Sequence, residues 1–519
     1  MKLEIKFLEG ECFWGGSSQD GYKNPFTKDS EYHEDYRVLC LNQTMPMFLS
    51  NKGRYIWSDN AFKVDISNGV LTLEGENIVE KKAGTCLRDA YLDAMKNHFP
   101  FNKRKLNDTF FKVAQYNTWM EFTYNPTEEG VLKYAQGIID NGFEPGILII
   151  DEGWHGRYGD WRFDPYKFPH PKETIAKLHE MGFKVMLWVV PLVCPDGRFF
   201  IEHADETLPN FPEHRKGMFL RDADGEVAMV RWWNGVSAIL DMRKESDQRF
   251  LKEQLDHLIA EYGVDGFKFD GGIPRMYSPA RMVNANARDD HDPFELNKAW
   301  FNFGSQYEFH EYKDSYMTGG KNSIQRLTDK NHRWDERGLA AFVPDAVVAG
   351  LLGNPFICPD MIGGGNWVDT IDPNLKADNE LFIRMAQTSA FCTMMQFSWA
   401  PWRVLNKEEL AIIQDASNLH KDLSTEFIAL VRKAEVDGEP ILRNLEYNYP
   451  HQGYEKIVNE FMVGEDILVA PVLTPKTYER EVILPAGTWK DADGNEYKGN
   501  ATYTLPCPLN KILWFRKVK

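Results

Sequence analysis

The sequence predicts an α/β protein whose centre is a β/α barrel of the TIM type, with a β-sandwich domain before it and another after it. Three observations lead to this prediction. A chain of 519 residues exceeds what one hydrophobic core usually supports. Its middle part alternates short apolar runs with helical stretches, whereas both ends carry alternating runs separated by turn residues. We therefore place the domain limits at residues 1–108, 109–433 and 434–519.

The first 108 residues predict an antiparallel β-sandwich. Their short runs alternate apolar and polar residues, and Gly, Asn and Asp separate them, which is typical of strands joined by tight turns. The strand-like runs are KLEIKFL, RVLCLN, FKVDIS and GVLTLEG.

The middle of the chain predicts the barrel. From residue 110 onward, apolar runs end in polar or aromatic residues, and a helical stretch follows each run. Two of the helices have clear start signals, one after Pro126 and one at Pro171. Six strands are predicted, in FFKVAQYNTW, GILIIDEGW, FKVMLWVVP, GVDGFKFDGG, PFICPDMIGG and TMMQFSW.

The last segment returns to alternating runs with Gly, Asn and Asp turns. This pattern predicts a C-terminal β-sandwich after the barrel. Its strand-like runs are FMVGEDILVAPVL, REVILPAGTWKDADGNEYKG and KILWFRKV.

The charge balance excludes two classes of partner. The chain has 60 Lys and Arg against 77 Asp and Glu, a formal net charge of −17. Such a surface repels phosphate backbones and anionic lipids, so we expect neither nucleic acid nor a membrane as a partner. The N-terminus mixes charges into its apolar residues and lacks the uninterrupted apolar stretch of a signal peptide, which predicts a cytoplasmic protein.

Cysteine and aromatic usage indicate the kind of site to expect. The seven cysteines are scattered and include no C-x-x-C pair, so we expect reduced thiols and no metal site. Aromatic residues make up 13% of the chain, with 15 Trp. Several Trp stand next to Asp, Gly or Arg, as in sites that bind the apolar faces and hydroxyl groups of sugars. Packing in the core is the alternative explanation for most of them.

The run GVDGFKFDGG contains the strongest chemical signal. Lys268 and Asp270 stand two residues apart, on one face of a buried parallel strand and at its carboxyl end. Barrel enzymes place their chemistry at that end, where Asp151 and Asp360 also stand after other predicted strands. A buried Lys keeps a neighbouring Asp ionised, as a nucleophile must be. A structural ion pair is the alternative.

The sequence resembles glycoside hydrolase family 31 over roughly residues 110 to 475. Several segments carry the resemblance in the family's order. They are Tyr116-Asn117-Thr118-Trp119, Ile150-Asp151-Glu152-Gly153-Trp154, Phe267-Lys268-Phe269-Asp270-Gly271-Gly272, Arg326-Leu327-Thr328-Asp329 with Trp334, Pro355-Phe356-Ile357 leading to Pro359-Asp360-Met361-Ile362-Gly363-Gly364, and Met395-Gln396-Phe397-Ser398.

This resemblance implies a retaining exo-acting α-glycosidase that needs no cofactor and no metal. It implies Asp270 as the nucleophile and Asp329 as the acid/base, a residue that spacing alone does not single out from Asp335, Glu336 and Asp345. Hydroxyl groups of the terminal sugar are expected to bind Asp151 and Asp360. The other expected substrate-binding residues are Trp119, Trp188 and Trp334 as pocket walls, together with Trp154, Trp233, Lys268 and Arg326.

Three departures from the family's glucosidase pattern bear on the sugar. Ile273 stands where many members have Glu, Arg326-Leu327-Thr328-Asp329 replaces Trp-x-Gly-Asp, and Ser398 stands in place of a sugar-binding His. The resemblance is therefore to the α-galactosidase branch, which makes an α-galactoside the expected substrate and a small carbohydrate the expected partner. A homo-oligomer stays open.

Alternative functions remain at this point. The same two carboxylates would serve an α-xyloside, an α-glucoside or an N-acetylated α-galactoside with different pocket walls. A non-catalytic sugar-binding protein could keep the fold, although both carboxylates are present. A metal-dependent barrel lyase could use Lys268 and Asp270.

Overall fold

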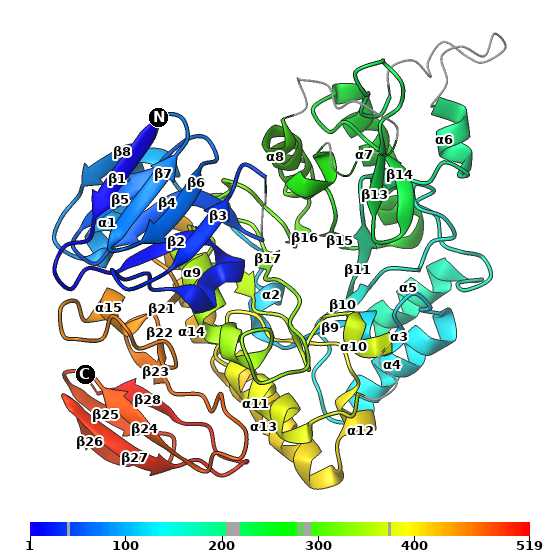
Figure 1. The fold of residues 1–519 in the computed structure, drawn as a ribbon. Helices are drawn as coiled ribbons and strands as arrows, with labels where there is room; N and C mark the ends of the chain where they lie inside the picture. The colour runs from blue at the N-terminus through cyan, green and yellow to red at the C-terminus, as the bar shows by residue number, and fades with distance from the viewer. Residues whose placement is uncertain are drawn as a thin grey trace.

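The computed structural model describes residues 1–38, 42–203, 218–278, 281, 283, 292–371 and 375–518. Within these residues the chain forms an N-terminal pair of sheets, a central barrel and a C-terminal pair of sheets. The two sheet domains lie on the same side of the barrel, which occupies the right half of Figure 1.

The N-terminal domain consists of two four-stranded antiparallel sheets, in the orders β1-β7-β6-β3 and β2-β4-β5-β8. Three of the predicted runs are strands, β1 (Lys2–Lys6), β6 (Lys63–Ser67) and β7 (Val70–Glu74). The predicted strand at 37–42 is wrong where the structure describes it, because Arg37 and Val38 lie in a turn after β3 (Tyr32–Asp35); residues 39–41 lie outside the described ranges. The remaining strands are β2 (Phe13–Ser17), β4 (Thr44–Ser50), β5 (Arg54–Trp57) and β8 (Val79–Lys82).

The barrel is a parallel sheet of nine strand segments in the order β18-β17-β16-β15-β11-β10-β9-β20-β19. The two end segments, β18 (Ile357–Cys358) and β19 (Met361–Ile362), follow each other in the chain, so the sheet is nearly closed. The predicted β/α barrel is therefore confirmed. The other strands are β9 (Gln115–Asn117), β10 (Ile147–Ile150), β11 (Lys184–Val189), β15 (Gly266–Phe269), β16 (Phe309–Tyr312), β17 (Gln325–Arg326) and β20 (Gln396–Phe397).

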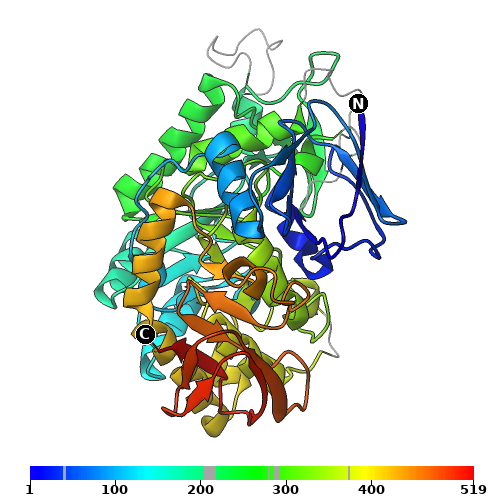
Figure 2. The same cartoon turned by 90° about the vertical axis from the view of Figure 1, so that its left-hand side faces the viewer.

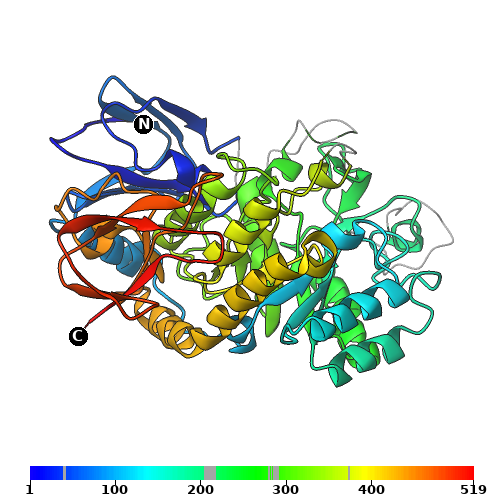
Figure 3. The same cartoon turned by 90° about the horizontal axis from the view of Figure 1, so that it is seen from below.

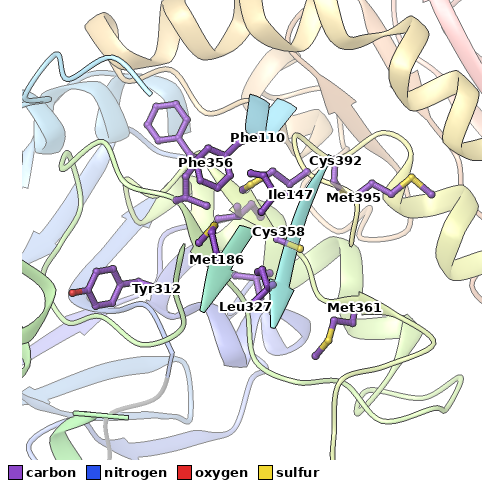
Figure 4. Close-up of a cluster of buried hydrophobic side chains, with 14 of the residues drawn as sticks. Phe110, Ile147, Met186, Tyr312, Leu327, Phe356, Cys358, Met361, Cys392 and Met395 are labelled. Carbon is purple, nitrogen blue, oxygen red and sulfur yellow. The ribbon is translucent and has the colours of Figure 1, made fainter. Parts of the chain in front are cut away.

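All six predicted barrel segments contain strands, but β16 and β17 were not predicted. Their sequences, FHEY and QR, are polar and short, so they lack the apolar run that identifies a buried strand. Both predicted helix starts are confirmed: α4 (Glu128–Asp140) begins after the N-cap Thr127, and α5 (Pro171–Glu180) begins at its proline. Apolar side chains fill the barrel, and Ile147, Met186 and Cys358 come together there from three different strands (Figure 4).

Helices surround the barrel, as the view from below shows for α11 (Asn379–Ser389) and α13 (Lys407–Asp422) (Figure 3). Helix α14 (Ser424–Asp437) runs across the proposed domain limit at 433 and ends at Gly438, which adopts the left-handed conformation. The C-terminal domain has a six-stranded sheet and a two-stranded sheet. It lies below the N-terminal domain in the side view (Figure 2).

One insertion matters for the site. After β11 the chain forms a three-stranded antiparallel sheet from β12 (Leu192–Val193), β13 (Met229–Trp232) and β14 (Gly235–Ile239). Trp233 and Asn234 form the tip of the β13–β14 hairpin. Among the described residues, no helix combines the length and apolar character that a membrane crossing requires.

Candidate active site

A cavity of about 370 Å³ opens where the barrel strands end. Side chains from several strand ends reach it because all strands are parallel and their carboxyl ends meet at one face. The predicted residues that line it are Trp119, Asp151, Trp188, Trp233, Lys268, Asp270, Arg326 and Asp329. The structure thus brings together both predicted catalytic residues and six of the nine other predicted site residues.

Three predicted binding residues do not line the cavity. The ring of Trp154 is fully buried behind the wall, where its indole nitrogen donates to the backbone oxygen of Trp188 at 2.8 Å. Trp334 packs on the core and donates to Asp378 at 2.8 Å. Asp360 has no exposed surface. The prediction that these three side chains contact the sugar directly is not met by their positions in the structure.

Asp360 supports the cavity wall from behind. Its Oδ1 accepts a hydrogen bond from Arg326 Nη1 at 2.9 Å, and its Oδ2 accepts from the backbone N–H groups of Lys330 and Gly365 at 2.6 and 3.0 Å. Since all these partners belong to the protein, Asp360 orients Arg326 and the chain after Asp329.

Asp270 stands directly after β15. Its Oδ2 accepts a hydrogen bond from Trp188 Nε1 at 3.0 Å, and its Oδ1 accepts from the N–H of Gly271 at 2.8 Å. Burial raises the pKa of Asp270, but the positive charges of Lys313 and Lys268 and these hydrogen bonds outweigh it, so the pKa lies below its usual range. Asp270 is ionised at neutral pH.

The expected pairing of Lys268 is different in the structure. Its ammonium lies 2.6 Å from Asp151 Oδ2, to which Asn117 also donates, at 2.8 Å. The direct partner of Lys268 is therefore Asp151, and its effect on Asp270 is a longer-range electrostatic one. Lys313, which follows β16, has the larger electrostatic effect on Asp270.

Asp329 lies three residues after β17, which is separated from β15 by β16 alone. It forms ion pairs with Lys313 and with Arg326, whose Nη1 lies 2.8 Å from Asp329 Oδ1. Its side chain is 22% exposed. Burial raises the pKa of Asp329, but the positive charges of Lys313 and Arg326 lower it more, so the pKa lies below its usual range. Lys313 thus stands between the two carboxylates, which both line one open cavity.

Asp329 and Asp360 are coupled through Arg326, which donates to both. Burial raises the pKa of Asp360 to about 6, and the negative charge of Asp329 adds to this effect. Two carboxylates that share one guanidinium titrate as a pair, so the first proton is bound by the pair as a whole and cannot be assigned to one residue.

A further carboxyl in the cavity, Glu152, was not predicted as a site residue. It accepts hydrogen bonds from Tyr158 at 2.8 Å, from Trp233 at 3.3 Å and from Asn234. Burial raises its pKa to about 8, with Asp151 and Asp270 contributing, so Glu152 holds a proton at neutral pH. The hydrogen bonds from Trp233 and Asn234 to Glu152 hold the tip of the β13–β14 hairpin against the cavity wall.

Sequence reasoning missed further lining residues because they directly follow the unpredicted strand β16 or belong to loops or to the N-terminal domain. A barrel of this type has eight strands, whereas the sequence predicted six. This difference could have indicated that two strands lie between residues 272 and 355. The lining residues that were not predicted are Gln19, Asn42, Tyr124, Arg275, Lys313, Asp314, Thr328, Asn366 and Trp367. Ile273, which departs from the family's glucosidase pattern, also lines the cavity.

No group of three or more His, Cys, Asp or Glu side chains with the arrangement of a metal site occurs among the residues that the structure describes. The polar groups that line the cavity are carboxylates, ammonium and guanidinium groups, most of them paired with one another, together with amide and hydroxyl groups. This set suits a substrate that offers hydroxyl groups.

Comparisons with known proteins agree with the fold. Residues 112–423 match the glycosyl hydrolases family 31 TIM-barrel domain, and residues 438–518 match the glycosyl hydrolase family 31 C-terminal domain. The myogenesis-regulating glycosidase of Mus musculus is 30% identical over 418 residues, which are 78% of this chain and 56% of that protein. Alpha-glucosidase 2 of Bacillus thermoamyloliquefaciens is 24% identical over 419 residues, 75% of this chain and 50% of that protein.

Among solved structures, a sulfoquinovosidase from E. rectale in complex with an aza-sugar inhibitor superposes with a TM-score of 0.84 at 16% identity, covering 99% of this chain and 82% of that one. This likeness concerns the fold. The chain spans about half the length of the two curated relatives.

Proposed function

The chain belongs to glycoside hydrolase family 31, and from this premise we propose that it is a retaining exo-acting α-glycosidase, with Asp270 as the nucleophile and Asp329 as the general acid/base. The observation that carries the proposal is that these two carboxylates, from the ends of β15 and β17, line one cavity with Lys313 between them. A cavity closed at the bottom by the barrel suits the removal of a terminal sugar.

The reaction has two steps. In the first, an Asp270 oxygen attacks the anomeric carbon, the bond to the leaving oxygen breaks, and Asp329 gives that oxygen a proton. A β-linked glycosyl ester of Asp270 results. In the second step, Asp329 takes a proton from water, the water oxygen attacks the same carbon, and Asp270 leaves. Two inversions retain the α configuration.

The charges of the free protein favour different parts of this cycle. Asp270 is ionised, as the attacking group must be. Lys313 and Arg326 favour the ionised form of Asp329, which suits its role as a base in the second step. In the first step Asp329 donates in its protonated form; its titration is coupled to that of Asp360, whose pKa burial raises to about 6.

Azide separates the two roles. With Asp329→Ala, azide is expected to intercept the ester and give an α-glycosyl azide, because the nucleophile is intact. With Asp270→Ala, azide attacks directly and gives the β-glycosyl azide. The configuration is read by NMR of the product. Asp335→Ala, which removes a nearby carboxylate outside the cavity, is the matched control and should behave as wild type.

The second part of the proposal concerns the identity of the terminal sugar. The names of curated relatives, an α-glucosidase, an α-xylosidase and a sulfoquinovosidase, favour a sugar other than galactose. An α-glucoside, an α-xyloside or a sulfoquinovoside therefore comes first. A panel of nitrophenyl α-glycosides measures this choice through the ratio of kcat/KM values.

An α-galactoside is the second candidate, and one position favours it. Ile273 lines the cavity where the family's glucosidase pattern has Glu, which removes a polar partner from that side of the sugar. The departure at Ser398 gives less support, since its hydroxyl is buried and accepts from the N–H of Met120 at 2.7 Å, away from the cavity. In the panel, turnover of the glucoside without turnover of the galactoside would reject this candidate.

A further inference from the structure

Asp314 is a carboxyl in the cavity to which the proposed mechanism assigns no task. Phe269 pairs with Tyr312 in the sheet, and the N–H of Lys313 donates to the Phe269 oxygen at 3.4 Å, so the chain after β16 leaves the barrel beside Asp270. Lys313 turns to Asp329, whereas Asp314 lines the cavity. The next lining residues on the neighbouring loop are Ile273 and Arg275.

The exposure of the lining residues gives the direction of the cavity. At the bottom, Asp151, Lys268 and Arg326 are at most 2% exposed. At the mouth, Trp233 and Trp367 are 42% and 41% exposed. Arg275 is exposed and Asp314 is partly exposed. An exo-acting enzyme holds the terminal sugar at the bottom, so the group that leaves lies at the mouth, beside Asp314 and Arg275.

Both side chains have unused hydrogen-bonding capacity. Within the described ranges, neither the carboxylate of Asp314 nor the guanidinium of Arg275 forms a hydrogen bond or an ion pair with another residue. Burial raises the pKa of Asp314 to about 7, with Lys313 opposing the shift and Asp270 adding to it. A carboxyl that faces the cavity and has no protein partner is available to accept hydrogen bonds from a ligand.

We propose that Asp314 and Arg275 form the binding site for the leaving group, and that this group is a polyhydroxylated one, a second sugar or a polyol. Asp314 accepts hydrogen bonds from hydroxyl groups of that unit, and Arg275 donates to its oxygens. The pair makes no contact with the terminal sugar and therefore selects for what that sugar is attached to. This inference rests on the proposed function for the orientation of the substrate.

Binding to an inactive protein tests the inference without turnover. The variant Asp270→Asn is titrated by calorimetry with two matched pairs of ligands, isomaltose with methyl α-glucoside and melibiose with methyl α-galactoside. In each pair the terminal sugar is the same and only the leaving group differs. In the pair that matches the pocket, the disaccharide is expected to bind more tightly than the methyl glycoside.

Adding Asp314→Ala should weaken the binding of the disaccharide by about tenfold, the effect of one hydrogen bond, and leave the affinity for the methyl glycoside unchanged. Asp314→Asn should give a smaller loss, and Arg275→Gln a loss in the same direction. Retained binding of the methyl glycoside shows that each variant is folded. Asp422→Asn, at an exposed site at the end of α13, is the control and should change neither affinity.

Equal losses for both ligands of a pair would place Asp314 at the terminal sugar and overturn the proposal. Unchanged disaccharide affinity in Asp314→Ala would also overturn it, and so would a disaccharide that binds to Asp270→Asn no more tightly than its methyl glycoside. Failure of the proposed function shows itself differently, as absence of turnover by the wild-type protein with the whole nitrophenyl panel.

Discussion

Lys313 determines the charge state of the cavity. Burial lowers its pKa, but Asp329 and Asp270 raise it more, so the pKa stays above its usual value and the ammonium is charged. The chain thus places one cation between two carboxylates that would otherwise repel each other. This explains why both Asp270 and Asp329 have lowered pKa values although burial alone would raise them.

Replacing Lys313 by Met should therefore impair the nucleophile. Without the ammonium, the pKa of Asp270 rises, so a larger fraction of the protein is inactive at low pH. The acid limb of kcat/KM should move to higher pH by about one unit, a typical effect of a neighbouring charge. Lys313→Arg keeps the charge and should restore the wild-type limb; an unchanged limb in Lys313→Met would argue against this role.

The coupled carboxyls predict a second pH effect. The pKa of Asp360 is raised to about 6, so the Asp329 and Asp360 pair holds its proton below that pH and loses it above. Hydrolysis of a disaccharide, whose leaving group needs a proton, should fall as the pH rises through about 6. A glycosyl fluoride leaves without a proton, and its kcat/KM should lack this alkaline limb. Identical profiles for the two substrates would contradict the assignment of Asp329 as acid.

The strand ends position these residues, and β15 and β16 do so most directly. The two strands pair in register from Gly266 with Phe309 to Phe269 with Tyr312. A Cβ atom at Gly266 would lie 1.9 Å from the Phe309 oxygen and 2.5 Å from its Cβ. Glycine at this position therefore lets the strands approach closely enough for Asp270 and Lys313 to leave the barrel side by side.

Gly266→Ala should force these strands apart. The expected loss is about 2 kcal/mol of unfolding free energy, because overpacking a rigid site costs that much. It should lower the midpoint of urea unfolding and reduce kcat at the same time. Gly156→Ala is the control, since a Cβ atom at that residue would have no neighbouring atom within 4 Å, and the substitution should leave both quantities unchanged.

The N-terminal domain takes part in the site although it lies outside the barrel. The buried side chain of Gln43 donates to the backbone oxygens of Lys313 at 2.8 Å and Arg326 at 3.0 Å. Asn42 donates to the same oxygen of Lys313 at 2.9 Å and also lines the cavity. The ends of β16 and β17 are thus fixed by a separate domain, and the cavity needs both parts of the chain.

Gln43→Ala should weaken this connection. Two backbone oxygens lose a buried partner, which costs about 2 kcal/mol of stability. We expect a lower melting temperature and, since Lys313 and Arg326 set the position of Asp329, a lower kcat. Gln136→Ala removes an exposed glutamine of α4 and is the matched control. A normal kcat in folded Gln43→Ala would show that the barrel positions these strand ends without the N-terminal domain.

Local patterns in the sequence predicted a barrel between two sheet domains and marked Asp151 and Asp270 at its strand ends, whereas Asp329 was predicted only through the resemblance to the family. Strands, helices and turns follow from local periodicity, and a polar residue directly after an apolar run marks the functional face of a parallel barrel. These signals lie within a few neighbouring residues, so no knowledge of distant contacts is needed to read them.

Which side chains reach the cavity, and how they pair, depends on contacts between distant parts of the chain. In the structure, Asp360, Trp154 and Trp334 lie behind the cavity wall or away from it, and Lys268 pairs with Asp151. Lys313 and Asp314 line the cavity, and Gln43 of the N-terminal domain donates to the backbone of Lys313. Strand β16, which Lys313 follows, and strand β17, which contains Arg326, are short and polar, so no local pattern predicts them. Their partners lie far away in the chain, and burial, charge and hydrogen bonding between such residues exist only once the barrel has closed.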